Sequence, residues 1–253
     1  MAGSHVPLDH ILLVMIALAW PLAEWRWYFP RSVRAIAAGV PGARVRLYRN
    51  SFVPQWVFTA CVISLWAFRA RPWALLMLGP TSPLRLGIAV ASAALSVVLL
   101  PLQRRKLFAQ PNWREMVRST LGHADPLVPR TTGEYRSMIV VALTAGVCEE
   151  FLFRGFVTWY FLAFWPGSGI GLVLAVMIRA IIFGFAHIYF GVRQVWVSAV
   201  VGVFFAIVVL AAGSLLPAMI MHAAMDLNSF DLGYRALHNT GEPGAGPAVP
   251  ASS

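Results

Sequence analysis

Residues 194–212 read QVWVSAVVGVFFAIVVLAA, a run of 19 residues without Asp, Glu, Lys or Arg. About 20 apolar residues are enough for a helix to cross the hydrocarbon core of a bilayer. The rest of the 253-residue chain has the same character, because 59% of its residues are hydrophobic. Only 12% are charged, against about a quarter in soluble domains. The sequence therefore predicts an integral membrane protein.

Further apolar runs precede and follow this one. Together with residues 194–212 they predict an all-α, polytopic bundle of about seven transmembrane helices. Arg69, Arg71 and Arg85 would then lie in an external turn, against the usual charge bias, which leaves room for an eighth, short span. The other runs cover approximately residues 8–25, 51–69, 85–102, 135–165, 170–189 and 214–235.

Polar stretches between the runs suggest how the chain is divided. Residues 26–50 and 103–136 are rich in arginine and proline and are predicted to be cytoplasmic loops. We expect N-terminal membrane helices over residues 1–134 and a second helix bundle over residues 135–236. The Gly- and Pro-rich residues 237–253 predict a disordered tail.

The positive charge of the chain is better explained by loops beside a membrane than by binding to nucleic acid. The net charge is +10, but the basic residues lie between apolar runs, and no soluble domain exists that could present a basic patch. Such clusters are typical of loops retained on the cytoplasmic side. Lys106 is the single lysine, a usage that suggests a GC-rich bacterial genome. We therefore expect the bacterial cytoplasmic (inner) membrane, with the N-terminus outside.

Ionisable residues inside the C-terminal runs suggest a function. A charged side chain at the centre of a membrane helix costs about 2.5–3.5 kcal/mol on insertion scales. Residues that persist at this cost normally pair with one another or face a polar cavity. Those inside the C-terminal runs include Glu149, Glu150, Arg154, His187, His222 and Asp226.

Helical spacing assigns different roles to these residues. Glu150 and Arg154 are four residues apart and share a helix face, so they are predicted to form a neutralising, supporting pair. Glu149 points about 100° away and remains a free carboxylate, as a general base requires. His222 and Asp226 also share a face.

If the three helices converge, these side chains form a catalytic site. Glu149 and His187 could hold a water that attacks a peptide carbonyl. His222 and Asp226 would then stand where the oxyanion develops, although an Asp can donate a hydrogen bond only when it is protonated. Glu149, His187 and His222 also form a His₂Glu set that could bind zinc with an open position for water. We favour the metal-free alternative, because Glu149 cannot easily be both ligand and base.

The order of these residues resembles a known family. Residues 149–154 fit the pattern EExxxR, residues 183–187 fit FxxxH, and residues 222–226 fit HxxxN/D. The three patterns together resemble the CAAX-protease and bacteriocin-processing family (CPBP) of intramembrane endopeptidases. Asp226 departs from the asparagine that is commoner in this family. The resemblance implies cleavage of a membrane-associated peptide or protein, in a cavity open to the cytoplasmic side.

Two other functions use the same residues. A proton- or ion-coupled transporter could use the buried acids and histidines as a relay, although no inverted repeat is evident. A non-catalytic membrane scaffold could retain them for helix packing. Motifs of other intramembrane proteases, such as HExxH or GxGD, do not occur in the chain.

Overall fold

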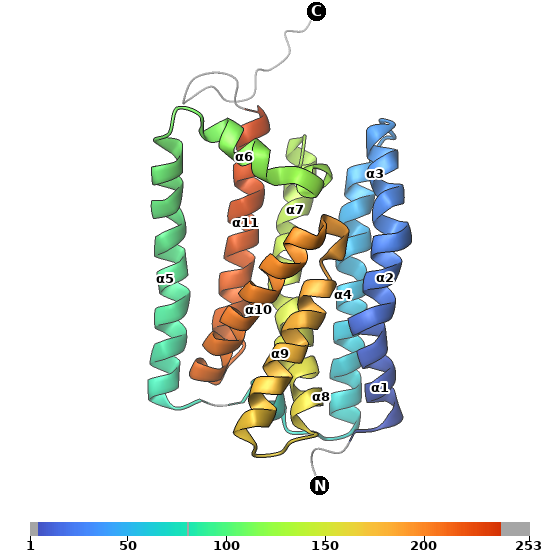
Figure 1. The fold of residues 1–253 in the computed structure, drawn as a ribbon, viewed down its shortest axis with the longest axis vertical. Helices are drawn as coiled ribbons and strands as arrows, with labels where there is room; N and C mark the ends of the chain where they lie inside the picture. The colour runs from blue at the N-terminus through green and yellow to red at the C-terminus, as the bar shows by residue number, and fades with distance from the viewer. Residues whose placement is uncertain (1–4, 80, 239–253) are drawn as a thin grey trace, which may run out of the picture.

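The computed structural model describes residues 5–79 and 81–238, and these residues form helices, turns and loops without β-strands. The long helices run side by side along the longest axis of the molecule (Figure 1). The predicted all-α helix bundle is therefore confirmed. Residues 239–253, most of the tail predicted to be disordered, lie outside the described part.

The first helix is longer than the sequence predicted. It continues to Ala37, and the next helix starts at Ala43, so the predicted loop over residues 26–50 is wrong. Proline lacks an N–H group and its ring clashes with the carbonyl four residues earlier. Here Pro21 and Pro30 each follow a π turn, which relaxes the ladder at that point. The segments are α1 (Pro7–Val14), η1 (Met15–Ala19), α2 (Trp20–Ala23), η2 (Glu24–Tyr28) and α3 (Phe29–Ala37).

The remaining apolar runs all form helices. Residues 73–76, in the weak continuation of the second apolar run, form only one 3₁₀ turn, which is too short to cross a bilayer. The polar stretch 103–136 contains a further short helix and the start of the next long one. The elements are α4 (Ala43–Phe68), η3 (Trp73–Leu76), α5 (Pro83–Phe108), α6 (Trp113–Leu121), η4 (Gly122–Leu127), α7 (Thr132–Thr144), η5 (Ala145–Val157), α8 (Thr158–Leu162), α9 (Gly169–Phe185), η6 (Ile188–Phe190), α10 (Val192–Ala212) and α11 (Leu216–His238).

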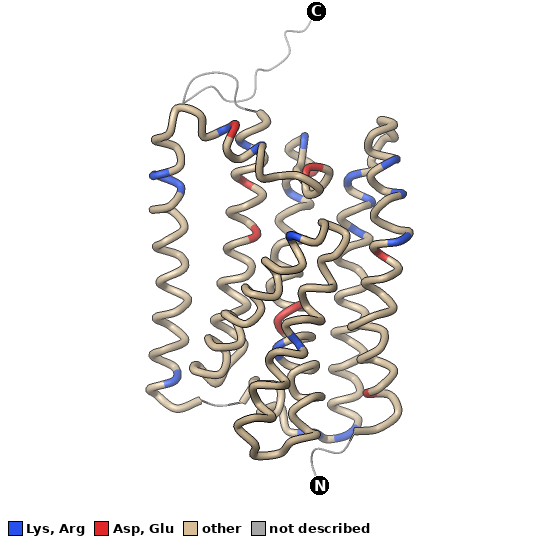
Figure 2. The backbone as a smooth tube through the Cα atoms, in the orientation of Figure 1, with Lys and Arg blue, Asp and Glu red and all other residues tan. Residues whose placement is uncertain are grey.

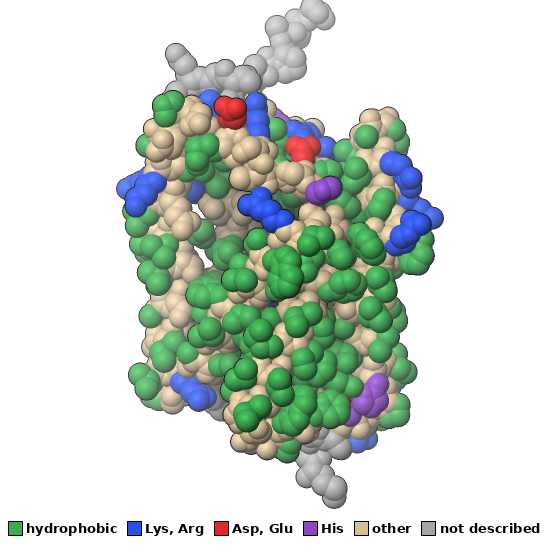
Figure 3. Space-filling model, in the orientation of Figure 1, with side chains coloured by type: hydrophobic (Ala, Val, Ile, Leu, Met, Phe, Trp, Pro, Cys, Tyr) green, Lys and Arg blue, Asp and Glu red, His purple; other side chains and the backbone are tan. Residues whose placement is uncertain are grey.

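Four helices in the described residues are long and apolar enough to cross a membrane: Pro7–Ala37, Ala43–Phe68, Pro83–Phe108 and Val192–Ala212. Helix α9 is apolar but shorter, while residues 132–162 and α11 carry the motif charges. Seven spans therefore stay a prediction. Hydrophobic side chains cover much of the visible face (Figure 3), and Lys and Arg concentrate at one end of the bundle (Figure 2).

The two predicted sections of the chain pack closely together. Helix α4 contacts α7 and η5, and α11 contacts α5, α6, α7 and η5. The main hydrophobic core accordingly contains residues from both sections, with Trp66, Phe156, Phe205 and Leu215 all fully or almost fully buried. The N-terminal helices are thus part of the wall that surrounds the motif residues.

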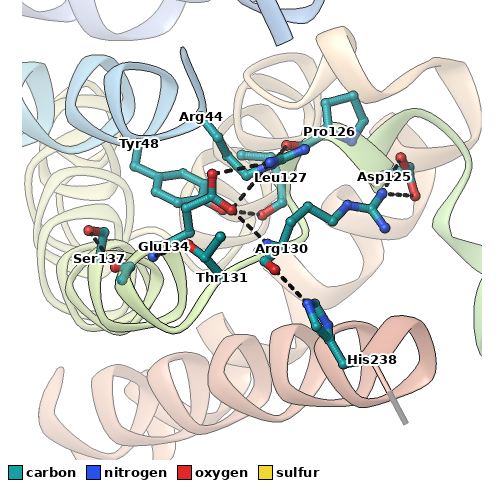
Figure 4. Close-up of polar contacts among 11 residues, drawn as sticks. Arg44, Tyr48, Asp125, Pro126, Leu127, Arg130, Thr131, Glu134, Ser137 and His238 are labelled. Carbon is teal, nitrogen blue, oxygen red and sulfur yellow. Dashed lines mark hydrogen bonds and ion pairs between the residues drawn. The ribbon is translucent and has the colours of Figure 1, made fainter. Parts of the chain in front are cut away.

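A polar network at one end also joins the two sections (Figure 4). The Arg44 guanidinium on α4 contacts both carboxylate oxygens of Glu134 at 3.2 Å, in the first turn of α7. Glu134 in turn accepts a hydrogen bond from the backbone N–H of Arg130 at 2.7 Å. The fully buried Tyr48 donates its hydroxyl hydrogen to the carbonyl oxygen of Leu127 at 2.9 Å. These contacts fix α4 against the segment that leads into the motif helix.

We expect Tyr48→Phe to lower the free energy of unfolding by about 1–3 kcal/mol, because it leaves the Leu127 carbonyl buried without its donor. Reversible unfolding in mixed micelles would measure the change. Tyr28→Phe is the matched control, since Tyr28 is 43% exposed and a surface substitution changes stability by less than about 0.5 kcal/mol. Equal effects of the two substitutions would contradict the assignment.

Candidate active site

Three elements bring the motif residues together. Glu149 and Glu150 lie on η5, His187 lies two residues after the end of α9, and His222 and Asp226 lie on α11. Gly146 allows η5 to approach α11 closely. A Cβ atom at this position would lie 2.7 Å from the Cβ of Ala223 and 2.8 Å from its backbone nitrogen. The absence of a side chain at Gly146 therefore lets the glutamates lie beside His222 of the third motif.

The glutamates lie on π-helical backbone. Residues 145–157 form π turns between the α-helical segments α7 and α8. Such turns are rare and occur frequently at functional sites. Glu150 is fully buried, and the Glu149 side chain is 15% exposed, so both face the bundle interior. Figure 2 shows acidic residues about midway along the bundle, far from both ends.

Glu150 has two partners and not only the one that was predicted. The predicted pair with Arg154 forms, with Nη1 3.0 Å from Oε1. The same Oε1 lies 2.8 Å from Nδ1 of His222. Because a carboxylate can only accept, Nδ1 of His222 carries the hydrogen of this bond. Glu150 therefore orients His222 in addition to balancing the charge of Arg154.

Glu149 presents its two oxygens to different neighbours. Oε1 accepts a hydrogen bond of 3.2 Å from the Gln55 side-chain amide on α4. Oε2 lies 3.9 Å from Nε2 of His187 and 3.9 Å from Nε2 of His222, too far for direct hydrogen bonds. This buried oxygen has no hydrogen-bond partner among the described residues. It is free to accept a hydrogen bond from a small molecule between the three side chains.

The orientation of His187 is set by a backbone carbonyl of the preceding helix, α9. Nδ1 lies 2.9 Å from the carbonyl oxygen of Phe183, so Nδ1 carries the hydrogen and Nε2 faces Glu149. The rings of Phe183 and His187 meet edge-on, with centroids 4.8 Å apart. The two residues therefore share a face, as the spacing of the FxxxH pattern predicted.

Asp226 lies beside His222 and further from the other motif residues. Its Oδ2 is 3.8 Å from Nε2 of His222, as expected for residues four apart on α11. The Asp226 side chain is 32% exposed, more than that of any other motif acid. Three carboxylates, those of Glu149, Glu150 and Asp226, thus surround one imidazole.

Two buried arginines, Arg154 and Arg179, lie beside the motif residues. The Arg154 guanidinium lies over the Phe183 ring, 4.0 Å from its centroid. The fully buried Arg179 donates to the carbonyl oxygen of Gly202 at 3.0 Å. A Cβ at Gly202 would be 3.6 Å from Arg179 and 3.7 Å from Arg154, so this glycine lies where the two guanidinium groups meet.

A cavity of about 60 Å³ lies in front of Glu149 and His187. A site needs about 10–15 Å³ to hold one water molecule, so the cavity can hold several. His222 and Asp226 do not line it. Its polar lining contains residues that the motif analysis missed: Glu24, Gln55 and Tyr189. The apolar lining consists of Ile16, Trp20, Pro21, Phe58, Leu152, Phe153 and Ala186.

The arrangement does not fit a zinc ion. Among residues 5–79 and 81–238, no group of three or more His, Cys, Asp or Glu side chains is arranged to hold a metal. Zinc bonds of 2.0–2.2 Å in tetrahedral geometry place neighbouring ligand atoms about 3.4 Å apart. The distances from Glu149 Oε2 to the two histidine Nε2 atoms are both 3.9 Å.

An apolar helix bundle with acids, histidines and a water-sized cavity inside it defines an integral membrane protein with a buried polar site. Residues 132–228 match the model of the Rce1-like family of type II CAAX prenyl endopeptidases. The predicted resemblance is confirmed, and the family is one of intramembrane endopeptidases; the transporter alternative is not favoured. No curated protein and no solved structure matches the chain.

Proposed function

We propose that this protein hydrolyses a peptide bond of a membrane-associated peptide or protein, with Glu149 as the general base. The observation that carries the proposal is the unpartnered Oε2 of Glu149, which faces two imidazole nitrogens beside a cavity large enough for water. Buried acceptors without partners are rare in proteins and often mark catalytic positions.

The hydrogen positions around Glu149 support activation of water. Oε2 of Glu149 and Nε2 of neutral His187 both accept, and 3.9 Å is a separation that one water can bridge with its two O–H groups. The lone pairs of that water then point away from both residues, toward a substrate carbonyl. Glu149 takes a proton as the water oxygen attacks and later returns it to the leaving amine.

His222 would stabilise the oxyanion. Its Nδ1 hydrogen is directed at Glu150, so Nε2 can donate only when the ring is an imidazolium. The three surrounding carboxylates favour that charged form. Asp226, with Oδ2 3.8 Å from Nε2, would add to the negative charge that favours the imidazolium. Removing one oxyanion donor typically lowers kcat by about 10²–10³-fold.

The charge distribution supports access to the site from the cytoplasm. Lys and Arg concentrate at one end of the bundle (Figure 2), which favours a cytoplasmic location for that end, in a bacterial inner membrane. A substrate anchored in the same bilayer would present its peptide bond to the cavity from that side.

Comparison of membrane-protein termini between wild-type cells and cells with Glu149→Gln would test the function. We expect new N-termini that depend on Glu149 and that map to membrane-anchored proteins. Identical sets of termini in the two strains, at equal protein levels, would contradict a protease.

We expect chelation to leave the reaction intact, because the proposed steps use only side chains of the protein. Cleavage of a reporter peptide by purified protein should stay within about twofold after treatment with 1,10-phenanthroline. Loss of activity that zinc restores would instead support the His₂Glu alternative.

A further inference from the structure

Glu24 is a carboxylate that the family match does not contain and that nevertheless faces the site. It lies on η2 of the first helix and lines the same cavity as Glu149 and His187. The cavity is lined by three residues of the first helix that follow one another at intervals of four: Ile16, Trp20 and Glu24. The first helix therefore presents one face to the site, and Glu24 is the charged residue on that face.

Several other acidic side chains in the bundle have an arginine partner. Such pairs neutralise the cost of a charge in an apolar environment. They are Asp9 with Arg71, Glu134 with Arg44, Glu150 with Arg154, and Asp231 with Arg104 and Arg235.

Two of the acids without an arginine partner line the cavity. Among the described residues, the acids without an arginine within 4.0 Å are Glu24, Glu149 and Asp226, together with the exposed Glu115 on α6. In the described part of the chain, the cavity lining contains two carboxylates and no Lys or Arg. A negative, apolar-walled cavity of this kind favours a cationic occupant.

From the position of Glu24 we infer that this residue is a specificity determinant that pairs with a Lys or Arg side chain of the peptide, close to the bond that is cut. This inference rests on the proposed function. Glu149 takes part in the reaction with water, so Glu24 is the cavity carboxylate that remains to bind a charge. A basic side chain could extend its apolar stem along Ile16, Trp20 and Phe58 and place its charge at Glu24.

The test uses full-length protein in liposomes and palmitoylated, internally quenched peptides of apolar sequence with one Lys, Gln or Glu at successive positions. We expect wild type to prefer Lys over Gln at one position by about tenfold in kcat/KM. Glu24→Gln should reduce this preference to about twofold or less, and Glu24→Lys should make the Glu peptide the better substrate. Glu115→Gln, the matched control, should keep the wild-type preference.

A binding measurement separates this inference from the proposed function. In a Glu149→Gln background, calorimetry in detergent compares the affinity of the Lys and Gln peptides with and without Glu24→Gln. A preference for Lys that Glu24→Gln removes supports the inference even if wild type cleaves nothing, a result that would reject the protease alone. An unchanged Lys preference in Glu24→Gln, no charge preference in wild type, or equal loss of cleavage for all peptides in Glu24→Gln would overturn the inference.

Discussion

Glu149→Gln is expected to lower kcat for a membrane-anchored peptide by about 10²–10⁴-fold, the range that a positioned general base contributes. The substitution keeps the shape of the side chain, and its amide can still contact Gln55. It removes the charge that accepts a proton from water. KM should change little, because Glu149 acts on the water and not on the bound peptide. Initial rates with purified protein in liposomes would measure both constants.

The control for this variant is Glu115→Gln, which removes one carboxylate from the exposed surface of α6. Both proteins should insert and unfold like wild type, because the Glu149 side chain is partly exposed to the cavity and has no arginine partner. A Glu149→Gln variant that cleaves at the wild-type rate would reject Glu149 as the base.

The sequence predicted the contacts that depend on local spacing. Glu150 with Arg154, Phe183 with His187, and His222 with Asp226 are all four residues apart, and each pair is in contact or close to it. The lengths of the apolar runs predicted the helices. In lipid there is no water to bond the backbone, so each run must satisfy its N–H and C=O groups internally, as a helix does.

Contacts between distant helices were not predictable in this way. The bond from His222 to Glu150 joins residues 72 positions apart, and the bond from Gln55 to Glu149 joins residues 94 positions apart. Gln55 has no distinguishing pattern around it. Glu24 did carry a signal, since it is a lone acid at the end of an apolar run, but Pro30 and the arginines after it indicated a loop. The π turn at residues 24–28 keeps the helix intact instead.

Arg154→Met is expected to cause the largest loss of stability, about 3–5 kcal/mol, because it leaves a buried carboxylate without its counter-ion. Glu150 is fully buried and Arg154 is 2% exposed, so water cannot replace the lost partner. His222 remains as the other partner of Glu150. Methionine retains much of the volume beside Phe183, so most of the loss should come from the charge. Denaturation in mixed micelles would measure it.

The double variant Glu150→Gln with Arg154→Met separates charge from packing. A glutamine at position 150 carries no charge and can still accept the hydrogen bond from Nδ1 of His222. The double variant should therefore recover at least about 1 kcal/mol of the stability that Arg154→Met loses. It should recover little activity, because one of the three carboxylates that favour the His222 imidazolium is gone. A double variant less stable than Arg154→Met would show that the guanidinium acts through its contact with Phe183, at 4.0 Å, and not through the buried ion pair.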